Sequence, residues 1–99
     1  MHNVKRLIER LYEADPEGLD RFVRTKGEAD RNALEVLLGL EWFESHQGGG
    51  CLALAAALPW GGEALITEEE GVDIPEDDEP AFLGFYDEDF VQEAEFRAP

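Results

Sequence analysis

The second half of this chain almost lacks basic side chains. Residues 48–99 contain fourteen Asp and Glu but a single Lys or Arg, which is Arg97. Residues 1–47 contain ten Asp and Glu against seven Lys and Arg, so most of the net charge of −16 lies in the second half. Binding to nucleic acid depends on Lys and Arg contacts to phosphates. The composition therefore argues against direct binding to nucleic acid or to an anionic membrane, and it favours a basic partner.

Cysteine and long apolar runs are also scarce. The single cysteine, Cys51, excludes an internal disulfide and a cysteine-based zinc site, and it suits a reducing compartment. The first residues lead directly into an amphipathic pattern without an apolar signal-peptide core, and no stretch is long enough to cross a membrane. We therefore expect a cytoplasmic protein, located in the host cytoplasm if the chain is encoded by a phage.

Recognisable catalytic and ligand-binding motifs are missing. Gly48–Gly50 has no Lys-Ser/Thr after it, as a phosphate-binding loop requires, and the acidic clusters Glu76–Glu79 and Asp87–Asp89 lack the ligand spacing of an EF-hand. His46 and Cys51 are close in sequence, but a lone cysteine in an Ala/Leu run is more often a small buried residue than a nucleophile. We predict no catalytic residue, no cofactor and no metal site, and hence no enzyme.

What the chain does contain is enough apolar sequence for one folded domain. Hydrophobic residues make up 43% of its 99 positions, and 10% are aromatic, whereas acidic disordered segments are poor in both classes. A chain of this length can bury a modest single core. We therefore expect one domain over residues 1–99.

The first half has the period of helices. Apolar residues fall on one helical face from Val4 to Tyr12, with Asn3 as the expected N-cap. Asp15-Pro16 predicts the start of a second, short helix, which Gly27 should end. A third helix is predicted from about Glu28 to His46. Its apolar residues, which include Trp42 and Phe43, cover more than one helical face, so we expect this helix to be central and Gly48–Gly50 to end it.

The second half has the period of strands. Glu63–Glu69 and Ala81–Tyr86 are bounded by turn residues. Phe90, Gln92, Ala94 and Phe96 alternate with Val91, Glu93 and Glu95, which suits a strand with one buried and one acidic face. The alanines of Cys51–Leu58 favour a helix, but the length of this segment and its glycine-rich flanks favour a strand that pairs with Glu63–Thr67. The predicted fold is α+β, with about three N-terminal helices (residues 1–47) packed on a small antiparallel sheet of three to four strands (residues 48–99).

The candidate binding residues are the carboxylates of the second half. Alternate residues of a strand lie about 6.7 Å apart on one face, so Glu93 with Glu95, or Glu68 with Glu70, would form acidic rows on the scale of nucleic-acid phosphates. Trp60, in the turn Pro59–Gly62, is a candidate aromatic anchor for a partner. The predicted contact residues are Glu68, Glu69, Glu70, Asp73, Glu76, Asp77, Asp78, Glu79, Asp87, Glu88, Asp89 and Trp60.

In size and acidity the chain resembles two groups of proteins. One group comprises the nucleic-acid mimics by which phages and plasmids counter restriction and CRISPR systems, and the other the acidic immunity proteins that neutralise nuclease toxins. The resemblance implies a small inhibitor that blocks the cationic nucleic-acid-binding surface of a basic, nucleic-acid-handling protein. The one-sided charge favours the anti-CRISPR or anti-restriction type. The alternatives are an immunity protein, or a generic acidic or halophilic adaptor without an inhibitory role.

Overall fold

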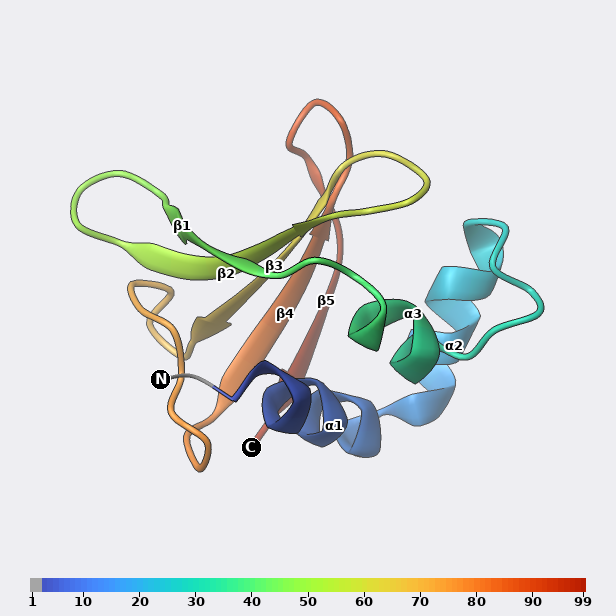
Figure 1. The fold of residues 1–99 in the computed structure, drawn as a ribbon, viewed down its shortest axis with the longest axis horizontal. Helices are drawn as coiled ribbons and strands as arrows, with labels where there is room; N and C mark the ends of the chain where they lie inside the picture. Colours follow the sequence, from blue (N-terminus) through green and yellow to red (C-terminus); the bar gives the residue numbers. More distant parts are fainter. Residues whose placement is uncertain (1–2) are drawn as a thin grey trace.

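Five antiparallel strands form one sheet in which each strand pairs with the next along the chain (Figure 1). The computed structural model describes residues 3–99. Its elements are α1 (Val4–Ala14), α2 (Pro16–Thr25), α3 (Ala33–Leu38), β1 (Phe43–His46), β2 (Leu52–Ala57), β3 (Glu63–Glu68), β4 (Ala81–Tyr86) and β5 (Gln92–Ala98). The α+β class and the antiparallel sheet are confirmed, but the sheet has five strands where three to four were predicted.

The first two helices begin where their capping residues place them. The side-chain oxygen of Asn3 accepts a hydrogen bond from the Arg6 amide at 3.0 Å, and that of Asp15 accepts one from the Gly18 amide at 3.0 Å. Both bonds satisfy amides that a helix leaves without a partner at its N-terminus. Gly27 follows α2 with a φ of 93°, which glycine adopts without strain.

The predicted third helix from Glu28 to His46 is wrong in extent. Only Ala33–Leu38 is helical, and Gly39 caps it with an amide hydrogen bond to Glu35. Phe43–His46 forms the edge strand β1, which pairs with β2. Phe43 pairs with Ala55 and Ser45 with Ala53, so these alternate residues share one face of the sheet. Gly48–Gly50 therefore ends no helix. All three glycines have positive φ and form the turn of the β1–β2 hairpin.

The later strands follow the predicted pattern closely. Cys51–Leu58 does contain a strand, β2, which pairs with β3, and β4 has the predicted bounds. The last strand lies two residues later than predicted, at Gln92–Ala98. A register shift at Phe85/Tyr86 lets Ala94 pair with Phe85 and Gln92 with Tyr86, so the period of two is interrupted at Glu93.

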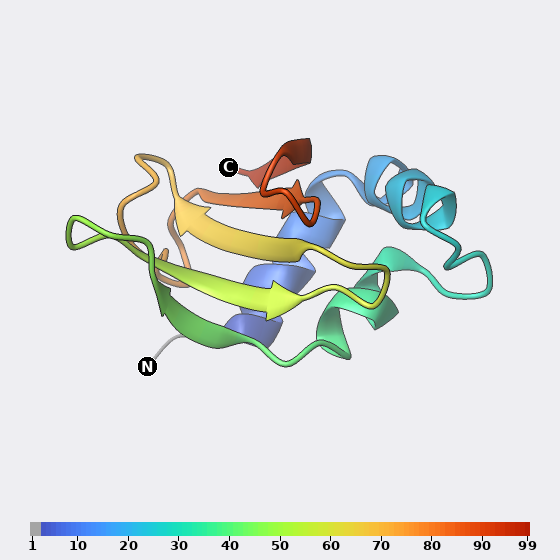
Figure 2. The same ribbon diagram turned by 90° about the horizontal axis from the view of Figure 1, so that it is seen from above.

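The helices all lie on the same side of the sheet, where α1 crosses behind the strands and α2 and α3 lie beyond the strand ends (Figure 2). Three fully buried residues of α1, which are Leu7, Ile8 and Leu11, belong to the core cluster that also holds Leu83 and Phe85 of β4. The opposite face has a smaller buried cluster of Ala53, Ala55 and Leu65, with Tyr86 packed against it. No helix among residues 3–99 has both the length and the apolar character needed to cross a membrane.

A single carboxylate joins the three helices. Asp20 of α2 accepts hydrogen bonds from the Tyr12 hydroxyl of α1 at 2.8 Å and from the Ala33 amide at the start of α3 at 2.8 Å. The bond to Asp20 raises the pKa of Tyr12, because it favours the protonated hydroxyl. Asp20 therefore positions α1 and α3 relative to α2.

We expect Asp20→Ala to lower the free energy of unfolding by about 2–3 kcal/mol, since it removes two hydrogen bonds to a charged, half-buried acceptor. Urea denaturation followed by circular dichroism measures this change. Asp30→Ala, at an exposed position, is the matched control and should change stability by no more than about 0.5 kcal/mol. Equal effects of the two variants would contradict the bridging role of Asp20.

Candidate protein-binding surfaces

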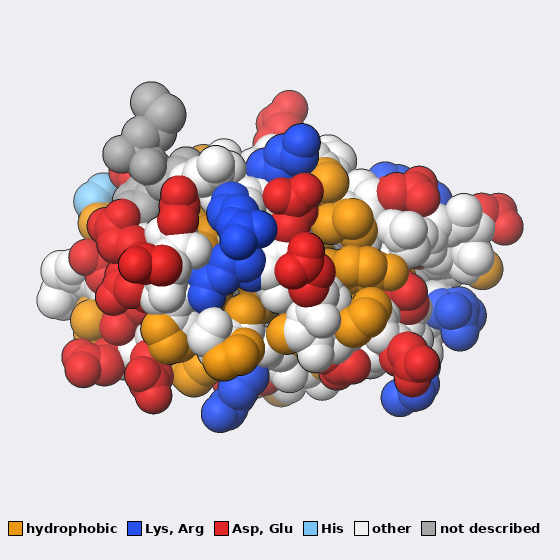
Figure 3. Space-filling view, turned by 90° about the horizontal axis from the view of Figure 1, so that it is seen from below, with side chains coloured by type: hydrophobic (Ala, Val, Ile, Leu, Met, Phe, Trp, Pro, Cys, Tyr) orange, Lys and Arg blue, Asp and Glu red, His pale blue; other side chains and the backbone are white. Residues whose placement is uncertain are grey.

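The structure divides the predicted contact carboxylates between two places. Eight of them lie in residues 68–79, between β3 and β4, which we call the acidic loop. The other three, Asp87–Asp89, lie in the β4–β5 turn at the opposite end of β4. The two ends of this six-residue strand are about 17 Å apart, because each of its five residue steps rises about 3.4 Å. Seen from the helical side, acidic side chains gather at the end of the molecule where the acidic loop lies, while basic ones are interspersed over the helices (Figure 3).

The predicted acidic rows along the strands do not form. Glu93 pairs with Lys26 of α2, and Glu95 lies 3.5 Å from the guanidinium of Arg97. Glu70 lies beyond the end of β3, and its amide donates to the carboxylate of Glu68. The register shift near Glu93 and the end of β3 at Glu68 are the physical reasons, because both interrupt the alternation on which the rows depend.

Backbone contacts hold the acidic loop against the rest of the fold. Arg10 of α1 donates to the carbonyl oxygens of Asp77 at 2.8 Å, Glu79 at 2.6 Å and Pro99 at 3.0 Å. Ile74 and Pro75 of the loop are buried, and the Val72 carbonyl accepts from the Leu52 amide of β2. The loop is therefore pinned at both ends and in its middle.

The carboxylate of Glu68 organises the start of this loop. It accepts hydrogen bonds from the amides of Val72 at 2.8 Å and Glu70 at 3.1 Å. These two amides, with Val72 the stronger, hold the pKa of Glu68 below its ordinary value of 4.5. Glu68 was predicted as a contact residue for a partner, and in the structure its carboxylate also stabilises the fold of the acidic loop.

Most of the negative charge of both places is left without a basic partner. Within residues 3–99, ion pairs join Lys26 to Glu93, Arg31 to Glu28, and Arg97 to Glu95. None of them reaches the acidic loop or the β4–β5 turn. Arg10 does reach the loop, but its guanidinium bonds to carbonyl oxygens and leaves the carboxylates free to face outward.

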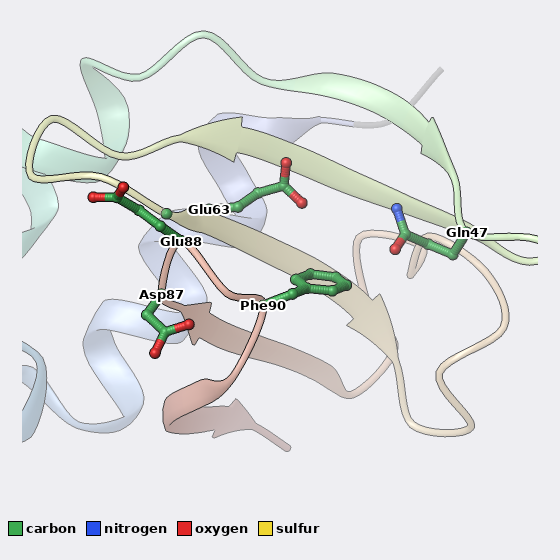
Figure 4. Close-up of a pocket in the computed structure, with 6 residues that line it drawn as sticks. Gln47, Glu63, Asp87, Glu88 and Phe90 are labelled. Atoms are coloured by element: carbon green, nitrogen blue, oxygen red, sulfur yellow. The ribbon is translucent and has the colours of Figure 1, made fainter.

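A groove lies on the sheet face that the helices leave open. Its volume is about 530 Å³, and it is lined by Gln47, Gly62, Glu63, Asp87, Glu88 and Phe90 (Figure 4). We call it the sheet-face groove. Close packing of the β2–β3 and β4–β5 turns builds it, because a side chain at Gly62 (φ 83°) would collide with the Tyr86 carbonyl oxygen and Glu88 lies across Gly61.

Phe90 is the unusual residue of this groove. Its φ of 61° lies in the left-handed region, which costs a residue with a side chain about 1–2 kcal/mol. Its ring contacts Tyr86 with centroids 4.8 Å apart, yet the residue is 54% exposed. A glycine or asparagine would suit this turn position better, so local folding does not explain the phenylalanine.

Trp60, the aromatic anchor predicted from the sequence, is half-buried. Its ring lies 6.3 Å from that of Phe22 on α2 and 6.4 Å from that of Phe85, so it joins the β2–β3 turn to the core. Exposed aromatic rings are found instead at Phe90 and at Phe43, which is 52% exposed. Sequence reasoning missed Phe43, which it placed in a helix. The alternation within Phe43–His46 was the available signal.

His46 and Cys51 have different partners across the β1–β2 hairpin. His46 pairs with Leu52 across the β1–β2 hairpin, whereas Cys51 accepts through its carbonyl from the Gln47 amide. Within residues 3–99, no cluster of three or more His, Cys, Asp or Glu side chains is arranged to hold a metal ion. No protein-family model, curated protein or solved structure matches the chain. The surfaces described above therefore carry the functional argument on their own.

We expect Arg10→Met, which keeps an apolar stem, to speed amide exchange in the acidic loop by at least roughly tenfold and to lower the free energy of unfolding by about 2 kcal/mol, since three bonds from a charged donor are lost. Hydrogen exchange followed by NMR at the Glu76 and Glu79 amides tests this. Arg6→Met, at an exposed position on the same helix, is the control. Unchanged exchange in the Arg10 variant would contradict the anchoring role.

The lowered pKa of Glu68 predicts a pH-dependent contribution to stability. Because the folded pKa lies below the unfolded one, the contribution is fully present above pH 4.5 and is lost as the pH falls through the folded value. Glu68→Gln should therefore be less stable than the wild-type chain at pH 7, and the difference should shrink below pH 4.5. Urea denaturation from pH 7 to about pH 3 measures it. Glu69→Gln is the control, and a pH-independent difference would refute the assignment.

Proposed function

We propose that this protein binds the cationic nucleic-acid-binding surface of a partner protein and blocks it. The observation that carries the proposal is the acidic loop, whose backbone is fixed by Arg10, Glu68 and buried Ile74 while its carboxylates lack ion pairs within residues 3–99. A fixed array of unpaired carboxylates loses little conformational freedom when it binds a basic surface. It also attracts such a surface over long range.

The repulsion between the carboxylates of residues 48–99 supports the same proposal. Fourteen carboxylates against one basic side chain in residues 48–99 disfavour the compact state. Among residues 3–99 the fold pairs Glu93 and Glu95 but leaves the carboxylates of the acidic loop without an ion pair, although α1 places a guanidinium within reach of the loop. We infer that the partner supplies the missing cations, and that it is a protein because its cations must match a fixed surface. The anti-CRISPR or anti-restriction type is the preferred assignment, and an immunity protein would use the same mechanism on a nuclease toxin.

The test is competition for nucleic acid. A partner captured with the tagged chain from the cytoplasm in which it is made should bind its DNA or RNA less as the chain is added, and electrophoretic mobility shifts measure this. Inhibition should weaken as salt rises, while circular dichroism shows the chain still folded in dilute buffer. A chain that unfolds as KCl is lowered, or a partner whose nucleic-acid binding is unaffected, would overturn the proposal.

Charge reversal locates the contact. We expect Asp77→Lys with Asp78→Lys to weaken the complex by roughly tenfold or more, because like charges then face each other across the interface. Arg10 bonds to the carbonyl of Asp77 and not to its carboxylate, so the loop keeps its anchor. Isothermal titration calorimetry measures the affinity. Glu9→Lys with Glu13→Lys on α1 is the matched control, and equal losses in both double variants would refute the loop as the site.

A further inference from the structure

The sheet-face groove contains an aromatic ring that the fold does not need. Phe90 has a positive φ, it is 54% exposed, and its ring contact in the turn is with Tyr86. Strain at an exposed position is often kept for function. In the groove the ring lies on the side of Glu63 of β3, whereas the side chain of Glu88 points away from the ring and lies over Gly61 (Figure 4).

The same sheet face already shows how such a ring can be used. The guanidinium of Arg97 lies over the ring of Phe82, 4.8 Å from its centroid, and 3.5 Å from the carboxylate of Glu95. The strand register places Phe82, Arg97 and Glu95 on the face that carries Leu65 and Ala55, away from the helices. One guanidinium is thus held between an aromatic face and a carboxylate.

Phe90 and Glu63 offer a ring and a carboxylate in one groove without a cation. No basic residue is among those that line the groove, and within residues 3–99 neither Glu63 nor Glu88 takes part in an ion pair. The groove volume of about 530 Å³ is large enough for a long side chain and part of its backbone. Its chemistry, an exposed ring beside an unpaired carboxylate, is complementary to a planar cation.

We propose that the sheet-face groove binds an arginine side chain from a basic segment of the partner protein, with the guanidinium stacked on Phe90 and paired with Glu63. The inference rests on the proposed function and names the group that is recognised there. Arginine is favoured over lysine because its planar guanidinium stacks on a ring and bonds to a carboxylate at the same time, whereas an ammonium is a compact, strongly hydrated charge. The acidic loop supplies attraction, and the groove supplies selectivity.

Two peptides test the inference without the partner. The isotopically labelled full chain is titrated with hexa-arginine and with hexa-lysine at about 150 mM salt, and NMR shifts report the residues contacted. We expect hexa-arginine to shift Gly62, Glu63 and Phe90 and to bind roughly two- to fivefold more tightly than hexa-lysine, the range of an exposed cation–π contact. Glu63→Gln should weaken binding of both peptides at these residues, and Glu88→Gln, whose carboxylate points away from the ring (Figure 4), should weaken it less.

The decisive variant is Phe90→Gly, because glycine adopts the left-handed φ freely and keeps the turn. It should abolish the preference for arginine. Phe43→Ala, which removes an equally exposed ring at the other edge of the sheet, should preserve it. Hexa-arginine shifts confined to the acidic loop, or an unchanged preference in Phe90→Gly, would overturn the groove and leave the proposed function standing. Failure of the chain to compete for the partner's nucleic-acid site would overturn the proposed function instead.

Discussion

The packing of α1 on the sheet is the contact on which the rest of the structure depends. Its buried residues Leu7, Ile8 and Leu11 cover the inner face of the last two strands. Arg10 on the same helix reaches past that core to hold the acidic loop by its carbonyl oxygens. Apolar burial thus places the helix, and the helix in turn places the most acidic segment. The position of the acidic loop therefore depends on the packing of the core.

Placing all three helices on one side of the sheet has a second effect. Among residues 3–99 no helix covers the other face, so its apolar residues are covered by side chains of the sheet itself. Tyr86, for example, lies across Gly84 and packs against the cluster of Ala53, Ala55 and Leu65. A sheet face of this kind is shallow over its alanines and raised at its aromatic residues. The sheet-face groove lies on this face, where Gly62 allows the β2–β3 and β4–β5 turns to meet.

Local signals predicted those elements that local physics decides. Asn3 and Asp15 cap helices because their side chains meet nearby amides, and β4 is bounded by turn residues on both sides. The prediction of one helix over Glu28–His46 was wrong. The apolar residues of this segment are dense enough to fit a helix, but Phe43–His46 pairs with β2 and forms a strand. Tertiary pairing overrides local preference in such a segment.

The candidate site was predictable in composition but not in arrangement. The excess of carboxylates is visible in the sequence, whereas their division between the two ends of β4 depends on the strand order. The capping role of Glu68 depends on how the loop folds back on it. The groove joins residues from three separate turns and strands, and the φ of Phe90 that marks it is a backbone property without a sequence signature.

The order of the contacts along the chain also bears on how the protein reaches its native state. Each strand of the sheet pairs with its immediate successor, so the sheet can grow from hairpins whose closure is entropically cheap. The first helix is different, because its apolar side packs on β4 and β5, which lie far from it along the chain. The contacts of α1 with α2 and α3 are local in sequence, whereas its contacts with β4 and β5 must close a long loop. The packing of α1 therefore couples the helices to the completed sheet in one cooperative transition.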